Sequence, residues 1–256
     1  MRIALGIEYN GDKLFGWQSQ QNLPTVQQYL ETALSKVADE PIQLYCAGRT
    51  DAGVHALQQV AHFDTTAIRA KRAWVWGGNS YLPPEISIHW AEEVDDSFHA
   101  RFSALSRRYY YLIYNHAVRS ALFHQKATWI HHDLDIERMQ LAANDLLGEQ
   151  DFSSFRSAQC ESKTPKRNIH HIYVTRNNDF ILIDIQANAF LHHMVRNITG
   201  LLLRIGAGQA EVAWAKAVLE AKDRRLAAET APASGLYLAD VSYPADYSFP
   251  KAKFLL

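Results

Sequence analysis

Apolar residues recur along much of the chain at the three- and four-residue spacing of an amphipathic helix. The clearest case is 25–38, where Val26, Leu30 and Leu34 are among the residues that would share one helix face. Thr25 and Gln28 have the spacing of a capping box, so we expect this helix to begin with that motif. The same spacing predicts further helices over residues 70–80, 135–147, 190–205 and 211–221.

Other segments are short, rich in β-branched and aromatic residues, and bounded by turn residues, which predicts strands. The expected strands cover residues 2–8, 42–47, 56–63, 86–92, 106–115, 168–175, 180–187 and 236–243. A few helices mixed with strands in short hairpins indicate an α+β fold with largely antiparallel sheets. We expect two similar mixed α/β halves, 1–98 and 99–256, joined without a low-complexity linker around a central cleft.

Length and composition narrow the class of protein. A chain of 256 residues with 48% hydrophobic side chains can bury a sizeable core, which excludes disorder as its main state. The apolar runs are too short to cross a bilayer, and Glu8 stands where a signal peptide would be apolar. We therefore expect a cytoplasmic protein without membrane contact, whose Cys46 and Cys160 are reduced.

The charges nearly cancel, with 26 basic against 27 acidic residues, but they are segregated along the chain. Residues 99–119 hold four arginines and no carboxylate, and residues 153–176 hold five basic residues and one acidic residue. Residues 133–151 are the reverse, with six carboxylates and one arginine. Each run could be an ordinary solvated face, or the basic runs could line a cleft that meets phosphates.

The turn Gly48-Arg49-Thr50-Asp51-Ala52-Gly53-Val54-His55 lies between two expected strands. Asp and Gly are common in turns for conformational reasons alone. Arg49, however, would keep the nearby Asp51 ionised and oriented, as a nucleophile or general base requires. Asp51 is thus a candidate catalytic residue.

The expected strand 106–115 carries the run Arg107-Arg108-Tyr109-Tyr110-Tyr111-Leu112-Ile113-Tyr114. Alternate side chains of a strand point to opposite faces, so one face of this run must be buried. Most of these tyrosines fit an aromatic core strand. Tyr109 lies beside the arginines near the strand start, where it could instead stack on a base.

In the run Asn188 to Asn197, Arg196 follows apolar residues in an expected helix, where a charge usually needs a partner. Arg196 could extend to solvent or reach a buried carboxylate such as Asp51. Three adjacent histidine pairs lack metal-ligand spacing, so we expect no metal site. Motifs for nucleotide phosphates, dinucleotides and serine hydrolases are absent from the sequence, which leaves an RNA- or nucleotide-handling protein with a carboxylate in its cleft.

The motif GRTDAGVHA closely resembles the catalytic motif of pseudouridine synthases, and the rest of the chain resembles their TruA family. The similarity extends over IEYNGDKLFGWQ, FHARFSALSRRYYYLIYN, DFSSFRSAQCESKTPKRNI, NAFLHHMVRNITG and GLYLADVSYP. It implies the pseudouridine synthase fold and the isomerisation of uridine to pseudouridine at positions 38, 39 and 40 of the tRNA anticodon stem-loop. No cofactor is implied.

Carried over by motif, the resemblance implies that Asp51 is the nucleophile, with Arg49 beside it in the turn. Tyr109 would stack on the target uracil and could transfer a proton, Arg196 would pair with the aspartate, and Leu236 would wall the base pocket. Attack at C1′ and attack at C6 of the base both remain open. The extra tyrosine in RRYYYLIYN and the tail SFPKAKFLL depart from the family pattern.

The resemblance also implies a homodimer that binds tRNA across basic surface of both subunits. The expected phosphate contacts are Arg101, Arg107, Arg108, Arg156, Lys163, Lys166 and Arg167. Two other functions stay open: a tRNA-binding chaperone without turnover, and a hydrolase that uses Asp51 as a general base. Neither explains why a carboxylate would be held beside an arginine.

Overall fold

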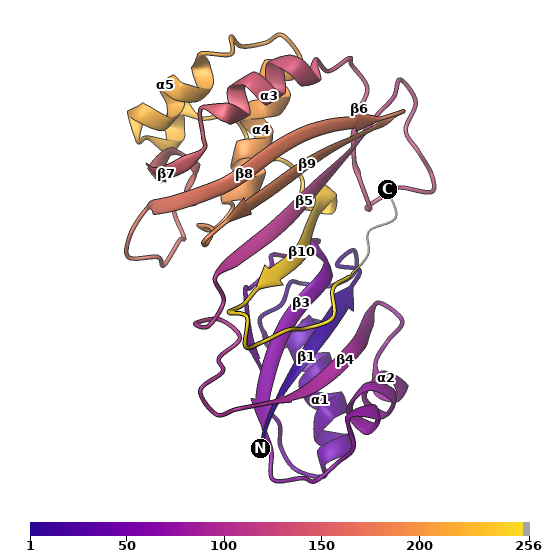
Figure 1. The fold of residues 1–256 in the computed structure, drawn as a ribbon. Helices are drawn as coiled ribbons and strands as arrows, with labels where there is room; N and C mark the ends of the chain where they lie inside the picture. Colours follow the sequence, from indigo (N-terminus) through magenta and orange to yellow (C-terminus); the bar gives the residue numbers. More distant parts are fainter. Residues whose placement is uncertain (253–256) are drawn as a thin grey trace. The chain divides into compact units, whose positions relative to one another are not determined.

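The computed structural model describes residues 1–252, which form two compact units (Figure 1). Among the described residues, unit 1 contains Met1–Leu105 and 237–252, and unit 2 contains Ser106–Leu236. The boundary expected from the sequence lies at residue 98, with 237–256 in the second half. By packing, the described C-terminal residues instead belong to unit 1. Residues 253–256, the end of the tail SFPKAKFLL, lie outside the described part of the chain.

Unit 1 is a mixed sheet covered by helical segments. Its elements are β1 (Arg2–Tyr9), α1 (Val26–Ala38), β2 (Tyr45–Cys46), β3 (His55–Asp64), a π-helical turn η1 (Ala73–Gly77), α2 (Gly78–Tyr81), β4 (Ile86–Val94) and β10 (Leu236–Ser242). The strand order is β4-β1-β3-β10, and β2 pairs with β3. The β1 pairs are antiparallel, whereas β10 runs parallel to β3. The buried side chains of Leu5, Leu34, Phe63 and Trp74 are part of its core.

The segment after β10 packs on unit 1 through aromatic rings and hydrogen bonds. Phe249 stacks on Trp90 at 4.7 Å between centroids and meets Phe98 edge to face at 5.6 Å. The side chain of Gln58 on β3 donates to the Pro250 carbonyl and accepts from the Ala252 N–H. The described C-terminal segment is therefore packed on unit 1, which also contains the N-terminus.

Unit 2 also combines helices with mixed, mostly antiparallel strands. Its elements are β5 (Ser106–Asn115), β6 (Thr128–Ile130), α3 (Ile136–Asn144), β7 (Gly148–Asp151), the 3-10 turn η2 (Ser153–Phe155), β8 (Lys166–Asn177), β9 (Phe180–Ala187), α4 (Met194–Gly206), α5 (Trp214–Ala221), and the 3-10 turns η3 (Arg224–Leu226) and η4 (Ala233–Gly235). The strand order is β5-β9-β8-β7, with β6 parallel to β5.

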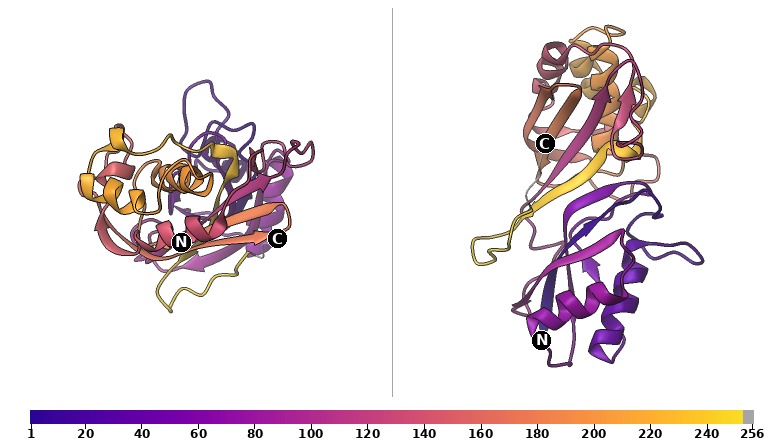
Figure 2. Two further views of the ribbon diagram at one scale, coloured as in Figure 1. Left: turned by 90° about the horizontal axis from the view of Figure 1, so that it is seen from above. Right: turned by 90° about the vertical axis from the view of Figure 1, so that its right-hand side faces the viewer.

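Alternation along the strands of unit 2 explains which face is buried. Ile181, Ile183 and Ile185 of β9 are fully buried on one face, and the residues between them are less buried. Helix α3 contacts both α4 and β8, and the helices gather beside the sheet (Figure 2). On α4, residues such as Ile198, Leu202 and Ile205 are buried at helical spacing.

Several local predictions need correction. Thr25 precedes α1 with an extended backbone but makes no capping hydrogen bond, so the predicted capping box is wrong. Only Tyr45–Cys46 of the strand expected over 42–47 is paired as a strand. The helix expected from Phe190 begins at Met194, because His193 has a positive φ of 64°. Strands β6 and β7 were not predicted.

None of the helices in residues 1–252 is long and apolar enough to cross a membrane.

Candidate active site

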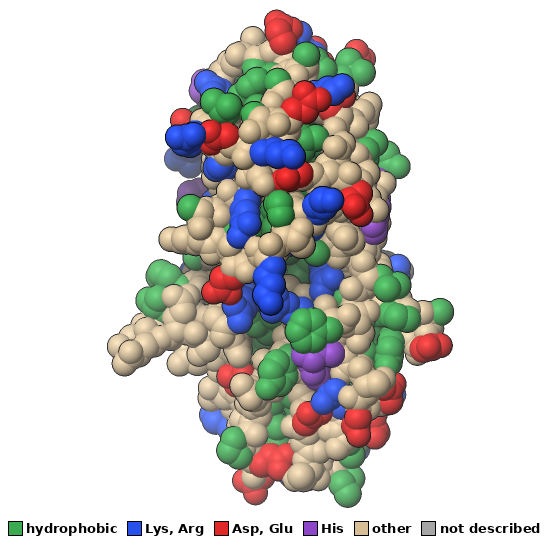
Figure 3. Space-filling model, turned by 90° about the vertical axis from the view of Figure 1, so that its left-hand side faces the viewer, with side chains coloured by type: hydrophobic (Ala, Val, Ile, Leu, Met, Phe, Trp, Pro, Cys, Tyr) green, Lys and Arg blue, Asp and Glu red, His purple; other side chains and the backbone are tan. Residues whose placement is uncertain are grey.

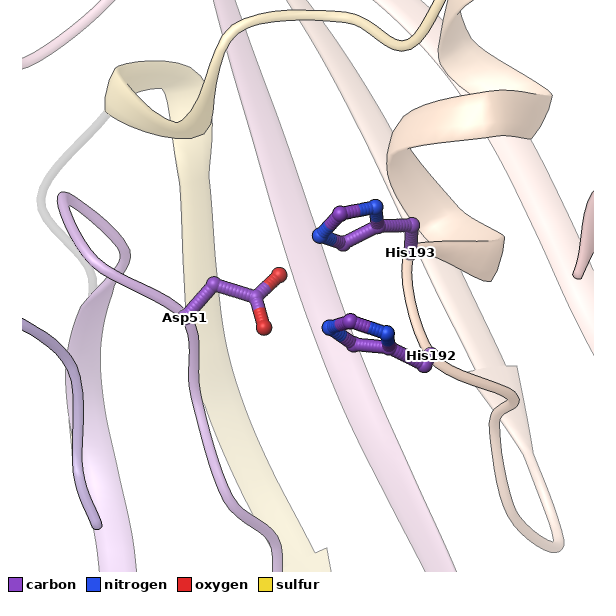
Figure 4. Close-up of side chains that lie close together, drawn as sticks. All are labelled: Asp51, His192 and His193. Atoms are coloured by element: carbon purple, nitrogen blue, oxygen red, sulfur yellow. The ribbon is translucent and has the colours of Figure 1, made fainter. Parts of the chain in front are cut away.

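The turn that carries Asp51 leads directly into β3 in unit 1 (Figure 4). Asp51 is half-buried, and its carbonyl accepts the N–H of Val54 at 3.2 Å. Gly53 has a φ of +78°, a conformation that favours glycine. The turn is thus a fixed piece of backbone that presents a carboxylate at the start of a buried strand.

The segment between β1 and α1 packs against this turn through two glycines. The N–H of Trp17 donates to the Thr50 carbonyl at 3.0 Å, and the N–H of Gly53 donates to the Leu14 carbonyl at 3.3 Å. A Cβ on Gly16, whose φ is +83°, would lie 2.7 Å from the Thr50 carbonyl oxygen. A Cβ on Gly11 would lie 2.1 Å from the Val54 carbonyl oxygen. Only glycine allows the two segments to approach this closely.

Buried side chains hold the turn from the other side. The Tyr9 hydroxyl and the Thr50 hydroxyl share a hydrogen bond of 2.7 Å. The Gln59 amide donates to the Gly48 carbonyl at 2.6 Å and accepts from the Gly48 N–H at 3.4 Å. Tyr9, Gln59 and the two glycines were not predicted as site residues. In the sequence, Tyr9, Gly11 and Gly16 appear only as members of the motif IEYNGDKLFGWQ. Gln59 appears only as a polar residue within an apolar strand.

Arg49 is exposed in the same turn. Burial raises the pKa of the neighbouring Cys46 thiol to about 12, although the positive charges of Arg49 and Arg101 act to lower it. Both guanidinium groups therefore act on the same small region beside the turn. The thiol itself stays protonated at neutral pH, in line with the expected reduced cysteine.

Unit 2 carries Tyr109 on β5. Tyr109, Tyr111 and Ile113 are all buried on one face, as expected, while Leu112 of the opposite face is buried as well and Tyr110 and Tyr114 are half-buried. Tyr109 meets Phe190 edge to face at 5.1 Å between centroids. The Tyr111 hydroxyl shares a hydrogen bond with the Thr128 hydroxyl at 2.6 Å and donates to the Pro232 carbonyl, and burial raises the pKa of Tyr111. Tyr111 is thus a core residue beside Tyr109.

Arg196 lies in the first turn of α4. Its Nε donates to the Ala231 carbonyl at 2.8 Å, and its own carbonyl accepts the Ala231 N–H at 3.1 Å. The preceding His192 and His193 (Figure 4) have their rings 4.0 Å apart. Leu236, the first residue of β10, is buried. The segment that leads to β10 and the start of α4 therefore fix each other.

Asn197, next to Arg196, is a fully buried polar residue that the sequence analysis did not weigh. Its amide donates to the Phe155 carbonyl at 2.8 Å, and its carbonyl oxygen accepts from Arg224 and from Thr230. One side chain thereby joins the start of α4 to three other segments of unit 2. A buried amide that is bonded through both its nitrogen and its oxygen positions its helix rigidly.

The expected RNA-binding residues fall into two groups. Arg101, Lys163 and Lys166 are exposed. Arg101 lies against the Phe102 ring. In unit 2, Arg107 donates to the Asn188 carbonyl, and Arg108 pairs with Asp184 at 2.5 Å. Arg156 donates to the Cys160 carbonyl, and Arg167 donates to the carbonyls of Thr164 and Lys166. Arg167 is also buried, so it serves the backbone of its own loop. Contact of any of the seven with phosphate stays a prediction.

A family model described as tRNA pseudouridine synthase matches residues 6–103 and 142–244, which include the Asp51 turn, β9 and α4. The chain belongs to the tRNA pseudouridine synthase family. It is accordingly an isomerase, and its mixed, mostly antiparallel α/β architecture agrees with the expected fold class.

Relatives of this family are similar over nearly the whole chain. The tRNA pseudouridine synthase A of Shewanella sp. (strain MR-4) is 58% identical over 98% of this chain and 96% of its own length. That of Histophilus somni (strain 2336) is 59% identical over 98% and 93%. Among solved structures, the archaeal box H/ACA sRNP Nop10-Cbf5 complex aligns with 78% of this chain and 44% of that chain, at 11% identity and a TM-score of 0.35. Nothing further follows from so distant a likeness.

Proposed function

We propose that this synthase isomerises uridine to pseudouridine at positions 38, 39 and 40 of the tRNA anticodon stem-loop, with Asp51 as the nucleophile. The reaction breaks the bond from N1 to C1′ and forms a bond from C5 to C1′, while C5 loses its hydrogen as a proton and N1 gains one. Atoms and electrons balance within the substrate, so the proposal needs no cofactor. Attack of Asp51 at C1′ and at C6 both satisfy this balance.

The observation that carries the proposal is the fixed turn around Asp51. Backbone bonds from Trp17 and Gly53 and the buried bond from Tyr9 to Thr50 fix the backbone that carries the Asp51 carboxylate. A nucleophile attached to rigid backbone loses little freedom when it meets its substrate, which is how positioning accelerates a reaction. A chaperone that only binds tRNA has no need of such a carboxylate.

Tyr109, Arg196 and Leu236 complete the proposal on the side of unit 2. Tyr109 would stack on the target uracil, and its hydroxyl would be available for proton transfer. Arg196 would stabilise the ionised Asp51, while Leu236 would wall the base pocket. Arg49 would act on the same carboxylate from within its turn. Support for these roles comes from the motif positions and from the fixed backbone on which each side chain is held.

We also propose that the enzyme is a cytoplasmic homodimer that binds tRNA across basic surface of both subunits. Support comes from the segregated charge of the sequence. Sedimentation of the purified protein, alone and with tRNA, tests the stoichiometry. A monomer that modifies tRNA at the full rate would contradict this part of the proposal and leave the chemistry intact.

The test of the chemistry compares Asp51→Asn with Asp12→Asn, which changes an exposed carboxylate of the loop after β1. We measure release of tritium from tRNA labelled at uridine C5, because only formation of the C5 to C1′ bond expels that hydrogen. Asp51→Asn should abolish release and keep tRNA affinity within a few-fold, since no phosphate contact is removed. Asp12→Asn should behave like the parent. Undiminished release by Asp51→Asn would rule out the assigned role.

A further inference from the structure

A cluster of aromatic and histidine rings lies on unit 1 outside the Asp51 turn. Tyr45 of β2 stacks on His62 of β3 at 5.3 Å between centroids, and His62 meets His99 at 4.6 Å. His99 in turn packs against Phe102 at 4.4 Å. Histidine and hydrophobic side chains adjoin on the face of unit 1 seen in Figure 3, with basic side chains nearby. The rings form a continuous row from β2 to the segment after β4.

The outer rings of this row are open to solvent in the described chain. Phe102 is 77% exposed and Tyr45 is 44% exposed, while His62 below them is buried. An exposed phenylalanine alone would be unremarkable, but a contiguous row of rings is a surface for a flat ligand. The row offers faces on which a planar ring can stack.

The rings are held in place by the backbone. His99 Nδ1 accepts the N–H groups of Arg101 and Phe102, at 3.1 and 3.4 Å. His62 Nδ1 accepts the N–H of Ala100 at 3.2 Å. These bonds order the backbone of the loop that carries Phe102 before any ligand binds, so little backbone freedom is lost on binding.

Two arginines supply positive charge beside the rings. The Arg101 guanidinium carbon lies 5.7 Å from the centre of the Phe102 ring. Arg49, from the turn of Asp51, and Arg101 both act on the thiol of Cys46, which follows Tyr45 in β2. Aromatic faces next to arginines are the combination with which proteins bind unpaired nucleotides: the base stacks and the guanidinium meets the phosphate.

We propose that Tyr45, His99 and Phe102 form a stacking platform for an unpaired nucleobase of the RNA substrate, with Arg101 at the adjoining phosphate. The platform rests on the proposed function in one respect, that the substrate is an RNA with unpaired bases. Stacking is tolerant of base identity, so the platform binds looped RNA without selecting a sequence. It is a binding site distinct from the target-base contacts assigned to Tyr109 and Leu236.

The histidines support this role as neutral rings. Burial lowers the pKa of His62 to about 4, with further lowering by His99 and Arg2, and burial also lowers the pKa of His99. At neutral pH His62 therefore contributes an uncharged aromatic surface, and the arginines supply the charge. The acceptor role of each Nδ1 agrees with this neutral form.

The experiment measures binding of a short single-stranded oligouridylate that contains one 2-aminopurine, whose fluorescence is quenched when it stacks. Phe102→Leu should weaken binding about tenfold and reduce the quenching, because stacking on an aromatic ring is lost. Phe102→Trp should restore both. The matched control is Trp76→Leu, since Trp76 is 79% exposed on η1 of the same unit, and it should bind like the parent.

The outcomes separate this proposal from the proposed function. Asp51→Asn should bind the oligonucleotide as the parent does, and a difference between Phe102→Leu and Trp76→Leu supports the platform whether or not tritium is released from tRNA. Equal affinity and equal quenching in Phe102→Leu and the parent would overturn the platform while leaving the isomerase activity untouched. A change in sedimentation of Phe102→Leu with unchanged RNA affinity would also overturn it, by assigning the ring face to contact between copies of this chain.

Discussion

The two units fix their candidate site residues in different ways. In unit 1 the carboxylate of Asp51 sits on a turn that is held chiefly by backbone groups of the segment after β1, and two glycines make this approach possible. In unit 2, Tyr109 and Arg196 are regular members of a strand and a helix, and their positions follow from register. The turn should therefore be sensitive to an added methyl group, whereas unit 2 should be sensitive to changes in the side chains themselves.

Among the variants that test this comparison, replacement of Tyr109 should have the largest effect on turnover. Tyr109→Leu should reduce turnover by orders of magnitude, because both the ring and the hydroxyl are lost. Tyr109→Phe keeps the ring, so its remaining turnover measures what the hydroxyl contributes. The control is Tyr110→Leu on the opposite face of β5, where the ring lies beside the Arg108 guanidinium. The measurement is the rate of tritium release from tRNA. If Tyr109→Leu releases tritium at the rate of the parent, Tyr109 has no role in the active site.

The next largest effect tests the backbone side of the comparison. Gly16→Ala introduces a Cβ at a φ of +83° and 2.7 Å from the Thr50 carbonyl oxygen. Gly148→Ala in unit 2 is a matched control, since Gly148 has a φ of +82° with no atom within 4 Å of the added Cβ. Both should lose about 1 kcal/mol of unfolding free energy from backbone strain. Gly16→Ala should lose more unfolding free energy than Gly148→Ala, as measured by denaturant unfolding. It should also lose turnover, as measured by tritium release. Equal losses in the two variants would contradict the role of close approach.

A pH effect should follow from His62 in unit 1. Because burial lowers its folded pKa to about 4, below the usual value near 6.5, the unfolded chain binds the proton more readily. The contribution of neutral His62 to the free energy of unfolding is fully present above about pH 6.5 and is lost as the pH falls toward 4. Its partners include Arg2 and His99, which oppose protonation, and Asp64, which favours it. Between pH 7 and pH 5 the parent should lose on the order of 1–2 kcal/mol more than His62→Gln in urea unfolding. Identical losses would show that His62 does not titrate as described.

The smallest expected effect concerns the exposed basic residues of unit 2. Lys163→Gln with Lys166→Gln should reduce the slope of log affinity against log salt by about 1.4, at roughly 0.7 per phosphate contact. Arg167 is unsuitable for this test, because its side chain is buried and bonded to its own loop. Lys36→Gln with Lys216→Gln removes the same charge from exposed helix positions and should leave the slope unchanged. An unchanged slope in the first variant would place the RNA path elsewhere.

Periodic segments were predictable from the sequence because their burial pattern is local. The bounds of β5 and β9 agree with the predicted strands, and the alternation of Tyr109, Tyr111 and Ile113 is as expected. Strands β6 and β7 span only 3 and 4 residues, too few for a period to show. The Thr25 hydroxyl is buried without a capping bond, so tertiary packing overrides the local motif.

The candidate site was predictable in its residue types but not in its supports. Asp51 and Arg49 stand out as a charged pair in a Gly-rich turn, and Arg196 stands out as a charge among apolar residues. The pairing of Arg108 with Asp184 and the bond of Tyr9 to Thr50 join residues far apart in the chain. Such contacts depend on strand register and on the path of the chain in space, and neither can be read from a local sequence pattern. The ring row of unit 1 depends on the same kind of non-local contact.

The return of the chain to unit 1 has a consequence for biosynthesis. Strand β10 is the parallel neighbour of β3, Tyr237 stacks on His55 at 4.6 Å, and Gln58 bonds to a carbonyl 192 residues further along. While a ribosome is still translating unit 2, the nascent N-terminal unit lacks this strand, and the start of β3 lacks its contact with Tyr237. Unit 2 is continuous in sequence and can fold as it emerges. Unit 1 therefore cannot be complete until β10 has been translated, which happens after the whole of unit 2.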